Sequence, residues 1–190
     1  MKPLVAVPLS SLAVVLAACS GNNTGANQPP STSAQGSSSA QSSSPTTQPV
    51  THVGGTLDLT GEQGVAMGVT LTQIINPANG AVGPPRDNNG NPNGSYVAVM
   101  VTIKNTGNSA LEDDANNDAA LVGSNNQTYT PALGAVTECT NFDNGVYRLQ
   151  PGESSTGCIA FVMPSGVSPS KFKYAPASGF ANDFGEWLIP

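Results

Sequence analysis

The stretch Tyr96-Val-Ala-Val-Met-Val-Thr-Ile-Lys104 decides the fold class of this 190-residue chain. Its large apolar residues occupy every second position: Val97, Val99, Val101 and Ile103. A period of two places these side chains on one face of an extended strand, whereas a helix would need apolar residues every three to four positions. The turn sequence Asn105-Thr-Gly-Asn108 follows directly. This region therefore predicts a half-buried β-strand that ends in a turn.

The same alternation recurs through the rest of the chain after residue 50. Further strands are predicted over residues 65–72, 158–163 and 171–174, with shorter ones over 56–60, 119–122, 147–149 and 186–189. No segment has helical periodicity for longer than a turn or two, and we find no internal repeat. Strands with one apolar face each pack as two layers. Residues 51–190 are therefore predicted to form an all-β, antiparallel β-sandwich domain.

Composition narrows the possible functions. Only 9% of residues are charged and 5% are aromatic, and the net charge is -6 with six basic residues. Six basic side chains cannot form the phosphate-neutralising surface of a nucleic-acid-binding protein, so we expect no nucleic-acid partner. A coiled coil would be rich in Glu, Lys, Leu and Arg, and this chain is not.

The N-terminus has the three parts of an export signal. A positive start at Lys2 precedes an apolar run over residues 4–16, and Ala17, Ala18 and Cys19 follow. The run is shorter than the about twenty residues that a membrane span requires. Leu16-Ala-Ala-Cys19 resembles the lipobox of bacterial lipoproteins. That resemblance implies that residues 1–18 are a lipoprotein signal peptide and that Cys19 receives a diacylglyceryl thioether and becomes the first residue. An ordinary secretory signal with a chance cysteine is the alternative.

Residues 19–50 are predicted to be the lipidated cysteine and a disordered linker. From Ser20 to Val50 there are nine Ser, four Thr, four Pro and four Gln residues and no charged residue. So polar a segment cannot bury enough apolar surface to offset the entropy lost on ordering. As a flexible coil it would span about 30 Å on average. Its composition also permits O-glycosylation, which composition alone does not establish.

A resemblance to a known domain family rests on four segments. They are residues 96–108, Leu149-Gln-Pro-Gly-Glu153, Gly157-Cys-Ile-Ala-Phe161 and Pro164. This pattern resembles a bacterial extracellular domain family of unknown function that has an immunoglobulin-like fold, and a similar domain occurs in secreted immunoprotective antigens of mycobacteria. The resemblance implies an immunoglobulin-like β-sandwich attached to the lipoprotein anchor. It brings no catalytic residues with it.

Cys139 and Cys158 remain after lipidation of Cys19, an even pair in an oxidising compartment. We predict a disulfide between them, which would contribute about 3 kcal/mol in the chain-entropy model. Cys158 has the opposite parity to Ile159 and Phe161. The bond should therefore hold the segment 138–144 to a sheet surface, unlike the inter-sheet disulfide that packs on Trp in antibody domains. A reactive thiol pair is the alternative.

An acidic segment at residues 112–118 contains a candidate metal-binding pattern. Asp114, Asn116 and Asp118 repeat the Asp-x-Asn-x-Asp opening of a calcium loop. Ala119 stands where that loop needs Gly, and Asn125 where it needs a bidentate Glu. A solvent-exposed acidic loop is therefore the default interpretation, with an irregular calcium site as the alternative. We expect no cofactor.

An enzyme is difficult to build from this sequence. His52, the single histidine, lies where the linker meets the domain, so a Ser-His-Asp set would lack a rigid base. No glycine-rich phosphate loop connects a strand to a helix. Met67, Met100 and Met163 could bind copper as soft ligands. However, Met67 and Met163 lie on apolar faces, where methionine usually fills a core.

These observations predict a lipid-anchored, non-catalytic binding or accessory domain of the bacterial cell envelope, facing outside the cytoplasm. The membrane is contacted through the lipid, and the expected partner is an envelope protein or a wall polymer. We expect the loops at residues 77–94 and 110–126 to form the contact surface. Loss of Lys2 with the signal shifts the net charge from -6 to -7, which disfavours contact with anionic lipid headgroups. A structural, antigen-like surface lipoprotein without a small ligand and a calcium-dependent adhesion module are the alternatives.

Overall fold

The computed structural model describes residues 49–181 and 183–190. The predicted signal peptide, the lipidation site Cys19 and the linker up to Gln48 lie outside the described residues. Val50, predicted to end the linker, is the first residue of a strand instead. Within the part that the structure describes, no helix combines the length and apolar character needed to cross a membrane.

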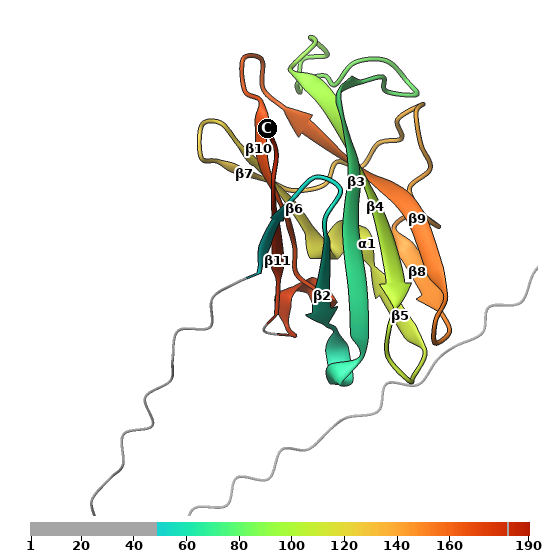
Figure 1. Cartoon of the computed structure of the whole chain (residues 1–190). Helices are drawn as coiled ribbons and strands as arrows, with labels where there is room; N and C mark the ends of the chain where they lie inside the picture. Colours follow the sequence, from blue (N-terminus) through green and yellow to red (C-terminus); the bar gives the residue numbers. More distant parts are fainter. Residues whose placement is uncertain (1–48, 182) are drawn as a thin grey trace, which may run out of the picture. The chain divides into compact units, whose positions relative to one another are not determined.

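The described chain is an antiparallel β-sandwich, which confirms the predicted fold class (Figure 1). Its strands are β1 (Val50–His52), β2 (Thr56–Thr60), β3 (Ala66–Ala78), β4 (Ser95–Asn105), β5 (Leu111–Asp114), β6 (Ala119–Gly123), β7 (Thr128–Tyr129), β8 (Val146–Leu149), β9 (Ser154–Met163), β10 (Pro169–Tyr174) and β11 (Gly185–Leu188). Its short helices are η1 (Glu62–Gly64), α1 (Ala115–Asp118) and η2 (Ala177–Gly179). One sheet has the order β1-β11-β10-β6-β7, another has the order β2-β3-β4-β9, and β5 pairs with β8. The pairing of β1 with β11 is parallel.

Strand β4 supplies one wall of the core, as its alternation predicts. Val97, Val99, Val101 and Ile103 are all fully buried. Phe172 of β10 and Trp187 of β11 belong to the same core cluster from the other sheet, with ring centroids 5.6 Å apart. The indole Nε1 of Trp187 donates a hydrogen bond to the Gly55 carbonyl at 2.9 Å, so its one polar atom is satisfied. The next residue, Leu188, is 37% exposed because it has the opposite parity.

Two predicted loops differ from the structure. The loop expected from residue 77 begins later, because β3 continues to Ala78 through register shifts after Leu71 and after Ile75. Most of the segment 110–126 is not a loop: residues 111–123 form β5, α1 and β6, of which β6 matches the strand predicted over 119–122. This segment contributes three residues to the main core: Leu111, Ala115 and Leu121. The free energy gained by burying them favours ordered structure here although their neighbours are acidic.

The four-stranded sheet also has a second, smaller apolar cluster on its outer face. It consists of Ala78, Ala98, Val136, Cys158 and Ala160. Ala98 lies in the middle of β4 with its neighbours Val97 and Val99 facing the main core, so this part of β4 is buried on both sides. A covering segment is needed to exclude water from the outer side, and that segment organises the candidate site.

Candidate functional site

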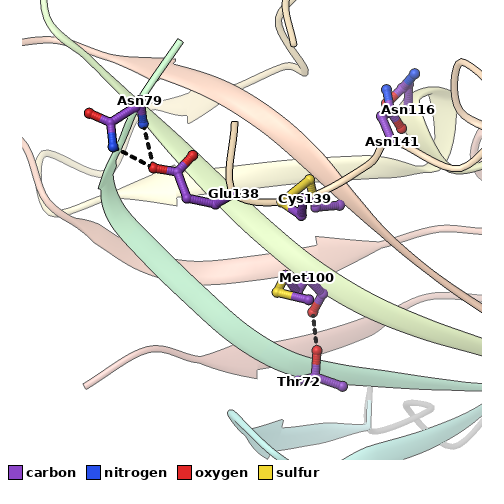
Figure 2. Close-up of a disulfide and its surroundings, with 8 residues drawn as sticks. Thr72, Asn79, Met100, Asn116, Glu138, Cys139 and Asn141 are labelled. Carbon is purple, nitrogen blue, oxygen red and sulfur yellow. Dashed lines mark hydrogen bonds between the residues drawn. A yellow bond between two sulfur atoms is a disulfide. The ribbon is translucent and has the colours of Figure 1, made fainter. Parts of the chain in front are cut away.

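The covering segment is residues 130–145, between β7 and β8, which we call the disulfide loop. Cys139 of this loop is bonded to Cys158 of β9, with the two Cα atoms 5.9 Å apart. Next to the bond, the Cys158 N–H donates to the Thr140 carbonyl at 2.9 Å. Figure 2 shows the disulfide between the loop and the sheet. The bond thus joins a loop to the outer face of one sheet and does not connect the two sheets.

Polar contacts with the β3–β4 connection hold the other side of the loop. Glu138 Oε1 accepts hydrogen bonds from the Asn79 backbone N–H at 2.8 Å and from Asn79 Nδ2 at 2.7 Å (Figure 2). These bonds, chiefly the one from the Asn79 backbone, lower the pKa of Glu138 despite the opposing effect of desolvation. The Thr137 N–H also donates to the Asn79 carbonyl at 2.9 Å. The loop is therefore attached by a covalent bond and by a charge-assisted pair.

Three asparagines connect the loop with α1. Asn141 Nδ2 donates to Asn116 Oδ1 at 3.2 Å, and Asn116 Nδ2 donates to the Asn144 carbonyl at 3.3 Å. The Oδ1 atom of Asn141 is buried and has no protein partner. Phe142 and Asn144 have left-handed backbone conformations, with φ of 37° and 53°. Such conformations are costly for residues other than glycine and persist where the surroundings impose them, often at binding sites.

A cavity of about 700 Å³, which we call the edge pocket, opens between the disulfide loop, β8 and β9. It exists because β8 and β9 are consecutive in the chain but pair in different sheets, so they separate after the turn between them. Four hydroxyl-bearing residues line it: Thr140, Ser154, Ser155 and Thr156. The aromatic residues Phe142 and Tyr147, of which Tyr147 is buried, and the charged residues Asp143, Arg148 and Glu153 are also in the lining. A second cavity of about 380 Å³ lies along the loop near Asn141 and also contacts Phe142. This lining can bind a polar molecule through hydrogen bonds and aromatic contacts, and its two carboxylates disfavour an anion.

The residues of the predicted calcium pattern have other roles. Asp114 caps α1: its Oδ1 accepts from the Asn116 N–H at 2.9 Å and its Oδ2 from Asn117 Nδ2 at 3.2 Å. Asp118 is 4% exposed, and its Oδ1 accepts from the Ser178 N–H at 2.7 Å. The Asp-x-Asn spacing is thus explained by a helix N-cap. Within residues 49–181 and 183–190, no group of three or more His, Cys, Asp or Glu residues is arranged to hold a metal ion.

Asp118 belongs to a buried polar cluster that the sequence did not reveal. Burial raises the pKa of Asp118 to about 8, and the neighbouring Asp113 carboxylate adds to the shift, while the Ser178 N–H opposes it. Asp113 Oδ2 accepts from the Ala177 N–H at 2.9 Å, so two carboxylates hold successive peptides of η2. No pattern in the sequence could have identified this cluster, since its parts are about sixty residues apart.

The methionines weighed as copper ligands and the single histidine do not line the edge pocket. Met67 and Met163 are fully buried in the main core, and Met100 is half-buried on the outer face, where its carbonyl accepts from Thr72 Oγ1 at 3.0 Å (Figure 2). His52 is exposed at the end of β1. Sequence reasoning identified Cys139 and Cys158 but missed the pocket beside them.

These features define a class of protein: a β-sandwich domain in which a disulfide holds a loop against one sheet. Hydroxyl-bearing residues line a cavity next to that loop. The chain belongs to the DUF4352 family, a domain of unknown function, whose family model matches residues 65–183. No curated protein matches the sequence.

Solved structures share the fold at low sequence identity. A secreted protein of Mycobacterium tuberculosis, MPT63, is 19% identical with a TM-score of 0.53, and the match covers 75% of this chain and 98% of that one. The YjhA protein of Bacillus subtilis is 15% identical with a TM-score of 0.52, covering 74% and 99%. A candidate lipoprotein of Bacillus subtilis, YcdA, is 15% identical with a TM-score of 0.51, covering 73% of this chain and 38% of that one. These likenesses establish the fold.

Proposed function

We propose that the protein is a lipid-anchored, non-catalytic binding domain of the bacterial cell envelope, facing outside the cytoplasm. The resemblance of Leu16-Ala-Ala-Cys19 to a lipobox supports the anchor, and the uncharged linker would separate the anchor from the domain. A disulfide suits an oxidising compartment. The proteins of similar fold include one described as secreted and one described as a candidate lipoprotein, in accord with this location. The sandwich, in this proposal, is a variant of the immunoglobulin-like fold.

The observation that carries the binding role is the edge pocket on a firmly held loop. Binding to a mobile surface loses affinity because side chains and loops must be ordered. Here a covalent bond, the Glu138–Asn79 pair and the asparagine contacts have already ordered the loop. A rigid scaffold that presents polar groups on one loop is a common arrangement for recognition.

Lipid attachment is tested by expressing the full chain in a bacterium fed a fatty acid with a clickable group. The chain should acquire the label and enter the detergent phase on Triton X-114 partitioning, because acyl chains bury apolar CH₂ groups. Cys19→Ala should remain unlabelled and aqueous, whereas Cys139→Ser combined with Cys158→Ser should still be labelled. An unlabelled wild-type chain, or a labelled Cys19→Ala chain, would refute the anchor.

The binding role is tested with the full chain carrying Cys19→Ala, so that the lipid does not confuse the result. We expect it to sediment with isolated bacterial envelopes. Replacing Phe142, which lies at the pocket, by Ala should weaken retention about tenfold, and thermal unfolding would verify that the variant is folded. Phe180→Ala is the matched control, because Phe180 is 84% exposed and does not line this pocket. Equal retention of the two variants would contradict the proposal.

A further inference from the structure

The half of the four-stranded sheet that the disulfide loop leaves open carries a row of threonines, one on each strand. Thr56 of β2 lies directly opposite Thr70 of β3, Thr70 opposite Thr102 of β4, and Thr102 opposite Thr156 of β9. Directly opposite residues share a face of the sheet, so the four side chains form one line across it. Neighbouring strands are about 4.8 Å apart, which gives the threonine row a length of about 14 Å.

The hydroxyl groups of this row are bonded in two pairs. Thr56 Oγ1 lies 2.7 Å from Thr70 Oγ1, and Thr102 Oγ1 lies 2.7 Å from Thr156 Oγ1. One hydrogen is used within each pair, so each pair keeps one O–H donor and several lone pairs for an external molecule. Thr56 and Thr156 are exposed, and Thr70 and Thr102 are half-buried. Either hydroxyl of a pair can donate to the other, so the row offers both donors and acceptors to an external molecule.

The surroundings of the row are flat and nearly neutral. The adjacent row across the same strands is Asp58, Gly68, Lys104 and Ser154, in which one acid and one base balance. Gly68 has no side chain, so no group projects from the centre of this face. A Cβ at position 68 would lie 3.6 Å from Cγ2 of Thr56. A protein partner would normally use aromatic or other large apolar anchors, which neither row contains.

The threonine row is continuous with the edge pocket. Thr156, its last member, also lines that pocket together with Ser154, Ser155 and Thr140. Phe142, at the same pocket, supplies an aromatic side chain. An extended molecule that lies along the row and passes the edge of β9 would thus reach a cavity with hydroxyl groups and the ring of Phe142.

We infer that the threonine row and the edge pocket together bind a strand of neutral, hydroxyl-rich polysaccharide. The inference rests on the proposed binding function and names its partner class. Sugar hydroxyls both donate and accept, which matches the paired threonines, and the apolar face of a sugar ring suits Phe142. An anionic polymer would be opposed by a chain of net charge -6 with few basic groups near the row. A neutral chain meets no such repulsion.

The test is native affinity electrophoresis of the full chain carrying Cys19→Ala through gels containing hydroxyethylcellulose, dextran or yeast mannan. At least one of these neutral polymers should retard the protein. Thr102→Val combined with Thr156→Val removes two hydroxyls while keeping β-branched side chains. This double variant should weaken retardation about tenfold or more, as expected for the loss of two net hydrogen bonds. Thr128→Val, at an exposed position of β7 in the other sheet, should bind as the wild type does.

Each outcome separates the inference from the proposed function. If the double variant is retarded like the wild type, or no neutral polymer retards the wild type, the polysaccharide inference is overturned. In both cases the proposed function survives if Phe142→Ala still lowers retention on isolated envelopes. Loss of retardation in the double variant with an unchanged melting temperature supports the inference. An equal loss in Thr128→Val would overturn it, since the effect would not be specific to the row.

Discussion

The two halves of the outer face of the four-stranded sheet differ although they share the strands β3, β4 and β9. One half is covered by the disulfide loop and contains small apolar residues, among them Ala98, Cys158 and Ala160. The other half, crossed by the threonine row, is open and polar. The covered half therefore contributes to stability, and the open half is available for contact. The same strands serve both purposes because the loop crosses only part of the sheet.

The largest effect is expected from removing the disulfide. Its cysteines are 19 residues apart, and loss of such a cross-link should lower the free energy of unfolding by about 3 kcal/mol. Urea unfolding of Cys139→Ser combined with Cys158→Ser, compared with the wild type, would measure it. Wild-type protein purified without reductant should show no reactive thiol at these positions. An unchanged unfolding midpoint would mean that the covered half is held without the bond.

A pair of glycine substitutions compares the packing of the disulfide loop with the open half. Gly157 lies opposite Val101 and therefore faces the core side of β9, where Phe142 of the loop packs. A Cβ at Gly157 would lie 2.5–2.7 Å from ring atoms of Phe142, so Gly157→Ala must displace that ring and should destabilise by about 1–3 kcal/mol. A Cβ at Gly68, in the open half, would meet no atom closer than 3.6 Å. Gly68→Ala should therefore change stability by less than about 0.5 kcal/mol. Thermal and urea unfolding would compare the two variants, and equal effects would contradict the close packing of the disulfide loop at Phe142.

The stability of the protein should depend on pH through Asp118 of α1. Asp118 ends α1, the helix that contacts the disulfide loop through Asn116, and its pKa is raised to about 8. The folded protein therefore keeps a proton that the unfolded chain loses near pH 4. This contribution makes the free energy of unfolding fall as pH rises from about 4 to 8 and level off above that.

Asp118→Asn removes this contribution, because an amide does not titrate and can still donate toward Asp113. Urea unfolding at pH values from 5 to 9 should show the variant gaining on the wild type as pH rises. A constant difference between the two proteins over that range would show that Asp118 is ionised throughout.

A second small stability effect is expected in the open half. Thr156→Val removes one cross-strand hydroxyl bond, the one to Thr102, at a cost of less than about 1 kcal/mol. Differential scanning calorimetry would show a small shift in Tm. A loss as large as that in Gly157→Ala would mean that the threonine row is chiefly a structural element.

The layered fold was predictable because it depends on local alternation. The large apolar residues of β4 occupy every second position, and all four are buried on one face: Val97, Val99, Val101 and Ile103. The extension of β3 to Ala78 was not predictable, since register shifts after Leu71 and Ile75 break the alternation. Strand β5 was not predicted because three of its four residues are acidic, which is typical of an exposed loop. It forms because Leu111 is buried and because the strand pairs with β8.

The candidate site was less accessible from the sequence. The even pair of cysteines left after Cys19 predicted the bond, and the parity of Cys158 predicted that it holds the loop to a sheet surface. The threonine row requires the register between strands up to 54 residues apart, as for Thr102 and Thr156, which no local pattern encodes. The edge pocket arises from the separation of β8 and β9 into different sheets, a property of topology and not of composition.

The most direct test of this division is amide chemical-shift mapping of the isotope-labelled full chain with Cys19→Ala during titration with soluble hydroxyethylcellulose. We predict shifts at Thr102, Thr156 and Phe142, which mark the row and the pocket, and none at Ala98 beneath the disulfide loop. Shifts confined to the connection between β3 and β4, or no shifts at saturating polymer, would contradict the assignment of the open half as the contact surface.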